Sequence, residues 1–157
     1  MGSGLYNSPI GKIIIKEECG IVTHLDFADC EIDKSIFNGE NGFIRRCFIE
    51  LDGYFAGKRK TFTVDTAFDG TPFRVRVWRE LAKIPYGAVI SYKTLAERVG
   101  SPGAARAVGG ANHHNNISII IPCHRVIGAD GSPVGYGGGI ERKKWLLEHE
   151  RRNCLVE

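Results

Sequence analysis

A turn-forming segment, Asp69-Gly70-Thr71-Pro72, separates two stretches of the chain that carry different hydrophobic patterns. Before it, short runs rich in β-branched residues are typical of strands; after it, apolar residues recur at helical spacing. A chain of 157 residues is long enough for one large core or two small ones. The change of pattern therefore predicts two domains, residues 1–72 and residues 73–157.

The first domain is predicted to hold a β-hairpin. Residues 11–16 and 21–27 are β-rich, and Glu17-Glu18-Cys19-Gly20 between them has the composition of a turn. A further short strand is expected over 61–64. Residues 1–9 show no such pattern and are expected to be loosely ordered.

The same domain is predicted to contain one amphipathic helix that ends near Gly57. Four apolar residues spaced i, i+4, i+7 and i+11 would share one face of it: Ile44, Phe48, Leu51 and Phe55. A small sheet with one helix makes this an α/β domain.

The second domain is predicted to be mostly helical, with a helix-turn-helix. One helix begins at Phe73 and ends before Pro85-Tyr86-Gly87. Ser91 is expected to cap a second helix over 92–99, and Ser101-Pro102 resembles the N-cap and first turn of a third. Two short helices joined by a glycine-containing turn predict a helix-turn-helix.

The rest of this domain follows in three segments. Ile117–Pro122 is predicted as a buried extended run, Gly128–Gly139 is rich in glycine, and Ile140–Glu150 is predicted as a closing helix.

Charge is divided unevenly between the two domains. Residues 1–72 hold 8 Lys and Arg against 11 Asp and Glu, whereas residues 73–157 hold 13 against 7. A basic half beside an acidic half favours contact of the basic half with a polyanion. A solvated charged surface without a partner is the alternative, and charge alone favours it because the excess is small.

Three classes of protein are disfavoured by the residue pattern. No apolar run approaches the roughly 20 residues that cross a bilayer, and no basic stretch leads into an apolar one as in a signal peptide. Five scattered cysteines without a CxxC pair argue against a disulfide-rich secreted domain and a cysteine-rich zinc module. We expect an intracellular protein, in the cytoplasm or nucleoid, or in the nucleus of a eukaryote.

A cysteine beside a histidine follows the most hydrophobic stretch of the chain. Cys123 would be held rigidly there, but a thiol needs a partner that stabilises its thiolate. Adjacent residues of a strand point to opposite faces, so His124 would need a turn or a bridging water to act on it. Glu148 or Glu150 would orient the imidazole. Without further context, a buried structural cysteine and histidine are the simpler interpretation.

Four segments in a fixed order change that interpretation. They are Ser91-Tyr92-Lys93-Thr94-Leu95-Ala96, Ala104-Ala105-Arg106-Ala107-Val108-Gly109-Gly110-Ala111, Ile121-Pro122-Cys123-His124-Arg125-Val126-Ile127-Gly128, and Gly135–Gly139 with Lys144–Glu150. Together these segments closely resemble the O6-alkylguanine-DNA alkyltransferases, also known as methylated-DNA–protein-cysteine methyltransferases. The resemblance is strong from Phe73 to Glu150, and it continues more weakly in Ser8–Gly11 and Leu51–Lys58.

The resemblance implies repair of DNA by direct reversal of damage. The protein would flip an O6-alkylated guanine out of duplex DNA and transfer the alkyl group to its own cysteine, once per molecule. The implied partner is double-stranded DNA carrying O6-alkylguanine. No metal, organic cofactor, membrane or obligate protein partner is implied, and we expect a monomer.

By the same resemblance, Cys123 is the acceptor and His124 takes its proton through a water while Glu150 orients the imidazole. Tyr92 crowds the 3′ phosphate of the target and donates to guanine N3. Asn115 belongs to the hinge between the helix-turn-helix and the active site. These roles suit the chemistry, since a protonated base is the better leaving group.

The resemblance also assigns residues that contact DNA and the base. Arg106 would enter the base stack in place of the extruded nucleotide, which offsets part of the cost of flipping. Small residues let its helix approach DNA closely: Ala104, Ala105 and Gly109. The base pocket would be lined by Tyr136, by the backbone near Val126, and by Gly137 and Gly138.

Two departures from the family are visible. Gly137 stands where some relatives have a serine that bonds the O6 atom, so a larger or looser pocket is expected. Some relatives bind structural zinc in the N-terminal domain; only Cys19 and His24 have suggestive spacing here, and we predict no zinc.

Three other functions fit the sequence less well. A lesion binder without transfer activity typically has tryptophan where this chain has Cys123. A helix-turn-helix transcription factor needs varied polar side chains for base readout, and this helix offers only Arg106 and Asn112. A cysteine hydrolase would leave Arg106 and Tyr92 without a role.

Overall fold

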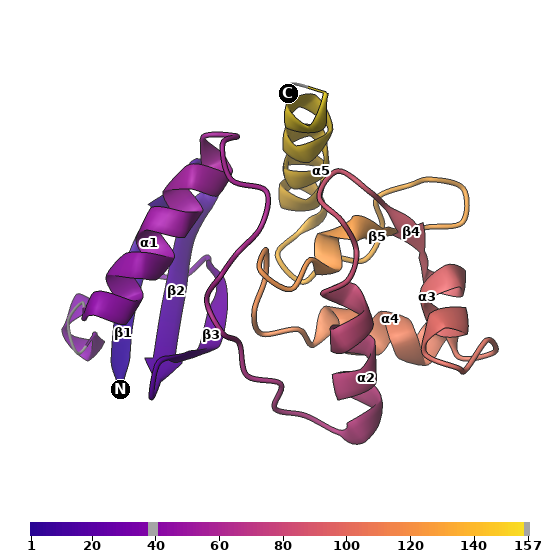
Figure 1. Ribbon diagram of the computed structural model, residues 1–157, viewed down its shortest axis with the longest axis horizontal. Coiled ribbons are helices and arrows are strands. Elements are labelled where there is room, and N and C mark those ends of the chain that lie inside the picture. Colours follow the sequence, from indigo (N-terminus) through magenta and orange to yellow (C-terminus); the bar gives the residue numbers. More distant parts are fainter. Residues whose placement is uncertain (38–40, 156–157) are drawn as a thin grey trace. The chain divides into compact units, whose positions relative to one another are not determined.

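Three strands form an antiparallel sheet in the first part of the chain, in the order β1 (Gly2–Ser8), β2 (Gly11–Glu18) and β3 (Ile21–Ala28) (Figure 1). The computed structural model describes residues 1–37 and 41–155, and it divides into two units, Met1–Ala67 and Phe68–Glu157. The predicted hairpin is β2 and β3, and its turn has two residues with positive φ, Cys19 at 51° and Gly20 at 82°.

The prediction that residues 1–9 are loosely ordered is wrong, because β1 pairs with β2 along its whole length. β1 contains glycine at Gly2 and Gly4, and at Gly4 the reason is packing. A Cβ built on Gly4 would lie 2.7 Å from Cγ2 of Ile44, so only glycine lets the helix above approach this strand.

That helix is α1 (Gly42–Phe55), and it packs on β1 and β2 (Figure 1). Asn41 caps it by accepting hydrogen bonds from the backbone of Phe43 and Ile44, and Gly57 follows its end with φ 75°. The predicted helix is thereby confirmed. A 3-10 turn, η1 (Lys34–Ile36), precedes it. The core between helix and sheet is built from Ile13, Ile15, Leu25, Ile44, Leu51 and Tyr54.

The strand predicted over 61–64 is absent. The backbone N–H of Thr63 donates instead to the buried carboxylate of Glu50 at 2.6 Å, and the Thr63 hydroxyl donates to the other oxygen at 3.0 Å. A side chain therefore satisfies the donor that a neighbouring strand would have used. The segment that follows meets β3 at Thr66, which bridges to Val22. The N–H of Val22 donates to the carbonyl of Asp65 at 2.8 Å, and the N–H of Ala67 donates to the carbonyl of Val22 at 2.9 Å.

The second unit consists of four helices and a short parallel pair of strands (Figure 1). Their bounds are α2 (Pro72–Leu81), β4 (Ile90–Ser91), α3 (Tyr92–Arg98), α4 (Ala105–His113), β5 (Val126–Ile127) and α5 (Ile140–Cys154). The predicted fold class, an α/β domain followed by a mostly helical domain with a helix-turn-helix, is confirmed.

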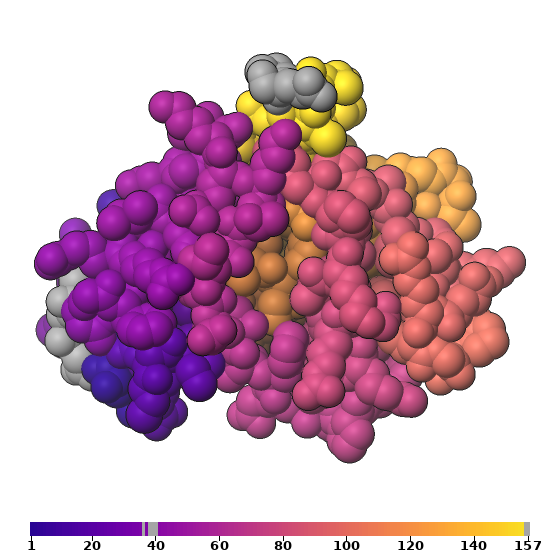
Figure 2. All heavy atoms as spheres, viewed as in Figure 1, coloured from indigo at the N-terminus to yellow at the C-terminus, as the bar shows by residue number. Residues whose placement is uncertain are grey.

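Helices α3 and α4 form the helix-turn-helix, and the turn between them lies at the surface (Figure 2). Ser91 caps α3 as predicted, by accepting from the backbone of Thr94. The predicted start of the next helix at Ser101-Pro102 is wrong. These residues form a turn in which the N–H of Ala104 donates to the carbonyl of Ser101 at 2.9 Å, and Gly103 within it is a poor helix former. Helix α4 begins at Ala105.

The run Ile117–Pro122 is buried but is not extended. Ile119 has φ 72°, and the N–H of Ile121 donates back to the carbonyl of Ile117 at 3.1 Å. The side chain of Asn115 closes this turn, since it accepts from the N–H of Ile117 and donates to the carbonyl of Ile121 at 2.8 Å. The turn leads directly into a 3-10 turn, η2 (Cys123–Arg125).

Across residues 1–37 and 41–155, no helix combines the length and the apolar character needed to span a membrane.

Candidate active site

Cys123 lies in η2 and is almost fully buried, with 3% of its surface exposed. It directly follows the turn that Asn115 closes, so the backbone before it is fixed by buried hydrogen bonds. Since η2 is helical, the opposed orientation expected of neighbouring residues in a strand does not apply to Cys123 and His124. The thiol is thus held at one place in the core of the second unit.

His124 is bound to Glu150 inside this core. Its Nε2 lies 2.6 Å from Oε2 of Glu150, and neither side chain is more than 2% exposed. An ionised carboxylate only accepts hydrogen bonds, so Nε2 carries the proton and Nδ1 of a neutral ring is an acceptor. Nδ1 is buried and has no hydrogen-bond partner in the part of the chain that the structure describes. The imidazole is therefore arranged as a base.

The carboxylate of Glu150 also holds Arg125. Nε and Nη2 of Arg125 donate to its two oxygens at 2.7 and 3.1 Å, and the N–H of Gly87 donates at 3.3 Å. Burial alone would raise the pKa of Glu150, but His124 and Arg125 outweigh it and lower that pKa well below its usual range. Burial lowers the pKa of His124, although Glu150 opposes this shift. Both shifts favour a neutral imidazole beside a charged carboxylate.

Lys143 is a buried cation of this site that the sequence analysis did not identify. Its ammonium group donates to the backbone carbonyls of Val126 and Val134, the second at 2.7 Å. Burial lowers its pKa to about 8, and electrostatic attraction to Cys123 works against that shift. A signal was present in the sequence, because Lys143 shares the buried face of α5 with Leu146 and Glu150 at helical spacing.

Tyr92, the first residue of α3, reaches the glycine-rich loop 128–139. Its hydroxyl donates to the carbonyls of Val134 and Gly135, at 2.9 and 3.0 Å. Burial raises the pKa of Tyr92, and its electrostatic interaction with Cys123 raises it further. Gly135 has φ 70°, and a Cβ there would lie 2.9 Å from the Tyr92 hydroxyl. Tyr92 and Lys143 together fasten this loop.

Asn112, near the end of α4, connects that helix to η2. Its Nδ2 donates to the carbonyl of Cys123 at 3.2 Å. On the far side, the indole N–H of Trp78 in α2 donates to the carbonyl of Ala111 at 2.8 Å. The end of α4 is therefore held between α2 and the residue that carries the thiol.

The residues predicted to line a base pocket lie around the same loop. Tyr136 and Val126 are buried, whereas Gly137 is exposed. The carbonyl of Gly138 accepts from Nη1 of Arg142 at 3.1 Å. A Cβ built on Gly137 would lie 3.3 Å from the carbonyl oxygen of His113. Because glycine has no side chain, the loop can approach the end of α4 closely at this point.

Apart from Tyr92 on α3, the residues predicted to contact DNA lie on α4 and on the residue before it. Arg106 is exposed in the first turn of the helix, Ala104 is its N-cap residue, and Ala105 begins it. Gly109, one turn later, would place a Cβ 3.9 Å from the ring of Tyr92. The helix thus presents an arginine to solvent at one end and reaches Cys123 through Asn112 at the other.

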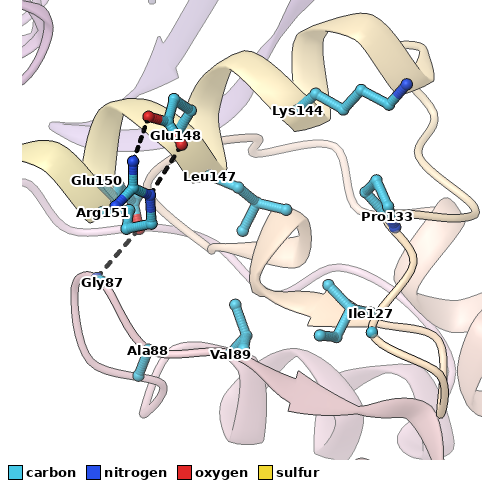
Figure 3. A pocket seen from close by; sticks show the side chains of 11 residues that line it. Gly87, Ala88, Val89, Ile127, Pro133, Lys144, Leu147, Glu148, Glu150 and Arg151 are labelled. Carbon is cyan, nitrogen blue, oxygen red and sulfur yellow. Dashed lines mark hydrogen bonds and ion pairs between the residues drawn. The ribbon is translucent and has the colours of Figure 1, made fainter.

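A pocket of about 520 Å³ is lined by Glu150 but not by Cys123 (Figure 3). Figure 3 shows Val89, Ile127 and Leu147 forming its apolar part, and neither Cys123 nor Tyr136 lines it. Glu148, the other carboxylate considered as a partner of His124, stands at its edge and binds Arg151 at 2.6 Å. Glu150, and not Glu148, is the acidic partner of His124.

No three metal-ligating side chains (His, Cys, Asp or Glu) are grouped among residues 1–37 and 41–155. Cys19 is exposed at the turn between β2 and β3, and His24 is half-buried in β3. In the second unit, His124 and Glu150 bind each other.

Comparison with known families gives two adjacent matches. Residues 1–68 match the family described as "6-O-methylguanine DNA methyltransferase, ribonuclease-like domain", and residues 72–152 match "6-O-methylguanine DNA methyltransferase, DNA binding domain". The methylated-DNA–protein-cysteine methyltransferase of Mycobacterium leprae is 47% identical over 152 residues, which cover 96% of this chain and 92% of the relative. That of Methanosarcina barkeri is 42% identical over 153 residues, covering 95% and 96%.

Solved structures agree with these sequence matches. The O6-methylguanine methyltransferase of Mycobacterium tuberculosis superposes with a TM-score of 0.89 at 41% identity, over 99% of this chain and 96% of that one. The M. tuberculosis OGT in complex with DNA superposes with a TM-score of 0.87 at 44% identity, over 95% and 92%.

Proposed function

Since the chain belongs to the 6-O-methylguanine DNA methyltransferase family, we propose that Cys123 is the residue of this protein that accepts the alkyl group. The protein is a methylated-DNA–protein-cysteine methyltransferase and repairs DNA by alkyl transfer. One observation carries the assignment of the site. The neighbour of Cys123 is a buried histidine whose Nε2 is bound to a carboxylate and whose Nδ1 is a buried acceptor.

The proposed substrate is an O6-alkylguanine that has been flipped out of duplex DNA. A base inside the duplex cannot reach a buried thiol, and extrusion costs a few kcal/mol. Arg106 would fill the space that the base leaves, as a long exposed cation at the start of α4 can. The small residues Ala104, Ala105 and Gly109 around it remove side chains that would keep the helix away from the DNA.

In the proposed reaction, Nδ1 of His124 takes the Cys123 proton through a water, and Glu150 stabilises the resulting imidazolium. The thiolate attacks the alkyl carbon; an S–C bond forms and the C–O6 bond breaks, with its electron pair left on the guanine. Tyr92 donates a proton to N3 of the leaving base, and the imidazolium restores that proton to the tyrosine. The thioether is stable to water, so each molecule acts once.

The extruded base would sit between η2 and the glycine-rich loop. Tyr136 and the backbone of Val126, Gly137 and Gly138 would line this pocket. Tyr92 and Lys143 support it, because they fix the loop to α3 and α5 through the carbonyls of Val134 and Gly135. No metal or organic cofactor takes part in the proposed steps.

Residues 73–157 are proposed as the DNA-binding and alkyl-transfer domain, acting as a monomer inside the cell. In support, every residue of the proposed site, from Tyr92 to Glu150, belongs to the single unit Phe68–Glu157. No second copy is needed to complete it.

The test is the intact mass of the wild-type protein after incubation with duplex DNA that carries one O6-methylguanine. We expect a gain of one methyl group per molecule, saturating at one equivalent, and peptide mapping should locate it on Cys123. Tight lesion binding without a mass gain would instead identify a damage-recognition protein. A methyl group on another cysteine would show that the acceptor is misassigned.

The Arg106→Ala variant should separate base extrusion from chemistry. We expect transfer from duplex O6-methylguanine to slow by about 10- to 100-fold, since flipping costs a few kcal/mol and this side chain offsets part of that cost. Reaction with the free base O6-benzylguanine, which needs no extrusion, should stay within about twofold of wild type. Rates for both substrates can be followed by mass, and Arg98→Ala on α3 serves as the control. Equal slowing on both substrates would contradict the proposed role.

A further inference from the structure

In the carboxamide of Asn112, the nitrogen makes a hydrogen bond and the oxygen makes none. The side chain is 2% exposed. Nδ2 donates to the carbonyl of Cys123 at 3.2 Å, whereas Oδ1 is buried and accepts no hydrogen bond from any of residues 1–37 and 41–155. A backbone carbonyl can only accept a hydrogen bond, so the amide atom that faces the Cys123 carbonyl must be the nitrogen. The other amide atom is therefore the oxygen, Oδ1.

A buried acceptor without a hydrogen bond destabilises the folded protein, because it has lost its bonds to water and gained none in return. An apolar side chain of similar shape, such as leucine, would fill the same space without that cost. The position of Asn112 is also tightly determined, since Trp78 binds the carbonyl of the preceding residue, Ala111, at 2.8 Å. The amide therefore keeps a free oxygen acceptor in a rigid setting where that oxygen contributes nothing to folding.

The surroundings of Asn112 are those of the reaction. It bonds to the backbone of Cys123, and its side chain also interacts with Tyr92. It lies between the proposed acceptor of the alkyl group and the proposed proton donor to the base. A free acceptor at this place is suited to a donor that the substrate brings.

We propose that Asn112 is a specificity-determining residue for the base, with Oδ1 accepting a hydrogen bond from the exocyclic amine of O6-alkylguanine. This inference rests on the proposed function. Alkylation at O6 removes the proton of N1, so in the nucleoside the 2-amino group is the only N–H donor left on the base. O4-alkylthymine has no N–H donor at all. An acceptor at Asn112 therefore selects guanine over thymine lesions by the chemistry of the base.

The experiment compares two duplexes that differ only in this amine, one with O6-methylguanine and one with O6-methylhypoxanthine. Second-order rate constants for methyl transfer are measured by mass for the wild type, Asn112→Leu and Asn116→Leu. Asn116 is an exposed residue of the following loop and serves as the matched control. We expect the wild type and Asn116→Leu to prefer the guanine substrate by about 10- to 100-fold, as for one hydrogen bond to a buried group. In Asn112→Leu the preference should fall to within about threefold.

Other results would overturn the inference. Equal slowing of Asn112→Leu on both substrates would mean that the residue only supports the structure. A wild type that does not distinguish the two duplexes would refute it without any variant, so the test does not depend on the folding of Asn112→Leu. Transfer to Cys123 from both duplexes at one rate would leave the proposed function standing, whereas transfer from neither would overturn both.

Discussion

The Cys123→Ser variant is expected to take up no methyl group from O6-methylguanine DNA while it still binds the duplex. A serine hydroxyl stays protonated where a thiol is converted to thiolate, and it is a much poorer nucleophile toward an alkyl carbon. Loss of a nucleophile lowers enzymatic rates by about 10⁶-fold, so the intact mass of the variant should not increase over hours of incubation. Since the proposed DNA contacts on α4 do not involve the thiol, the salt-dependent affinity for the duplex should remain.

Cys47 provides the matched control for that variant. It is as deeply buried as Cys123, in α1 of the first unit, and burial raises the pKa of its thiol to about 11. It therefore has little thiolate at neutral pH, and Cys47→Ser should take up one methyl group as the wild type does. A methylated Cys123→Ser protein would mean that another residue is the acceptor.

The Glu150→Gln variant is expected to lose both stability and activity. Glutamine keeps the shape but not the charge, and it leaves Arg125, 6% exposed, buried without its carboxylate partner. Breaking a buried ion pair from one side costs about 3–5 kcal/mol. The imidazolium of His124 also loses its counter-charge, so transfer should slow by at least about 10²-fold. Urea unfolding and the single-turnover rate measure the two effects separately.

Glu148 lies on the same helix and gives the control for Glu150. It pairs with Arg151 at the surface, where both side chains are about half exposed. Exposed pairs contribute less than about 1 kcal/mol, so Glu148→Gln should unfold near the wild-type midpoint and transfer at the wild-type rate. If Glu150→Gln and Glu148→Gln had the same unfolding midpoint and the same transfer rate, Glu150 would have no role in the proposed mechanism.

The pH dependence of stability follows from the same carboxylate. The pKa of Glu150 is lower in the folded protein than in the unfolded chain, so the unfolded chain binds the proton first as pH falls. Its contribution to stability is complete above the ordinary value of 4.5 and is lost progressively below it. The free energy of unfolding should therefore fall more steeply between pH 5 and 3 in the wild type than in Glu150→Gln, by about 1 kcal/mol or more.

The sequence predicted those parts of the fold whose pattern is local. The spacing of apolar residues predicted α1 and the cap at Ser91 predicted α3, because both depend on neighbouring residues. The sequence did not predict β1, because Gly4 is needed for the close approach of α1, whose contacting residue Ile44 lies about forty residues further along the chain. The turn after Asn115 was also not predicted, because a short apolar run is compatible with either a strand or a buried turn.

The candidate site divides in the same way. Cys123, His124, Glu150, Tyr92 and Arg106 came from motifs read in order along the chain. Lys143 and Asn112 did not, because their partners are backbone carbonyls, which carry no residue identity. No pattern of side chains indicates which carbonyl a buried lysine or asparagine will meet. The helical spacing of Lys143 indicates its burial, but the carbonyls that Lys143 and Asn112 bind become recognisable only when the chain is folded.

Tyr92 has a single hydroxyl proton, and in the structure that proton is already shared between the carbonyls of Val134 and Gly135. In the proposed reaction the same proton goes to the base, so a lesion must compete with the loop for it. Arrival of the substrate and release of the loop at Tyr92 are then one event. In that reaction, a base that reaches the pocket without a good acceptor would leave the Tyr92 hydroxyl bonded to the loop and would receive no proton.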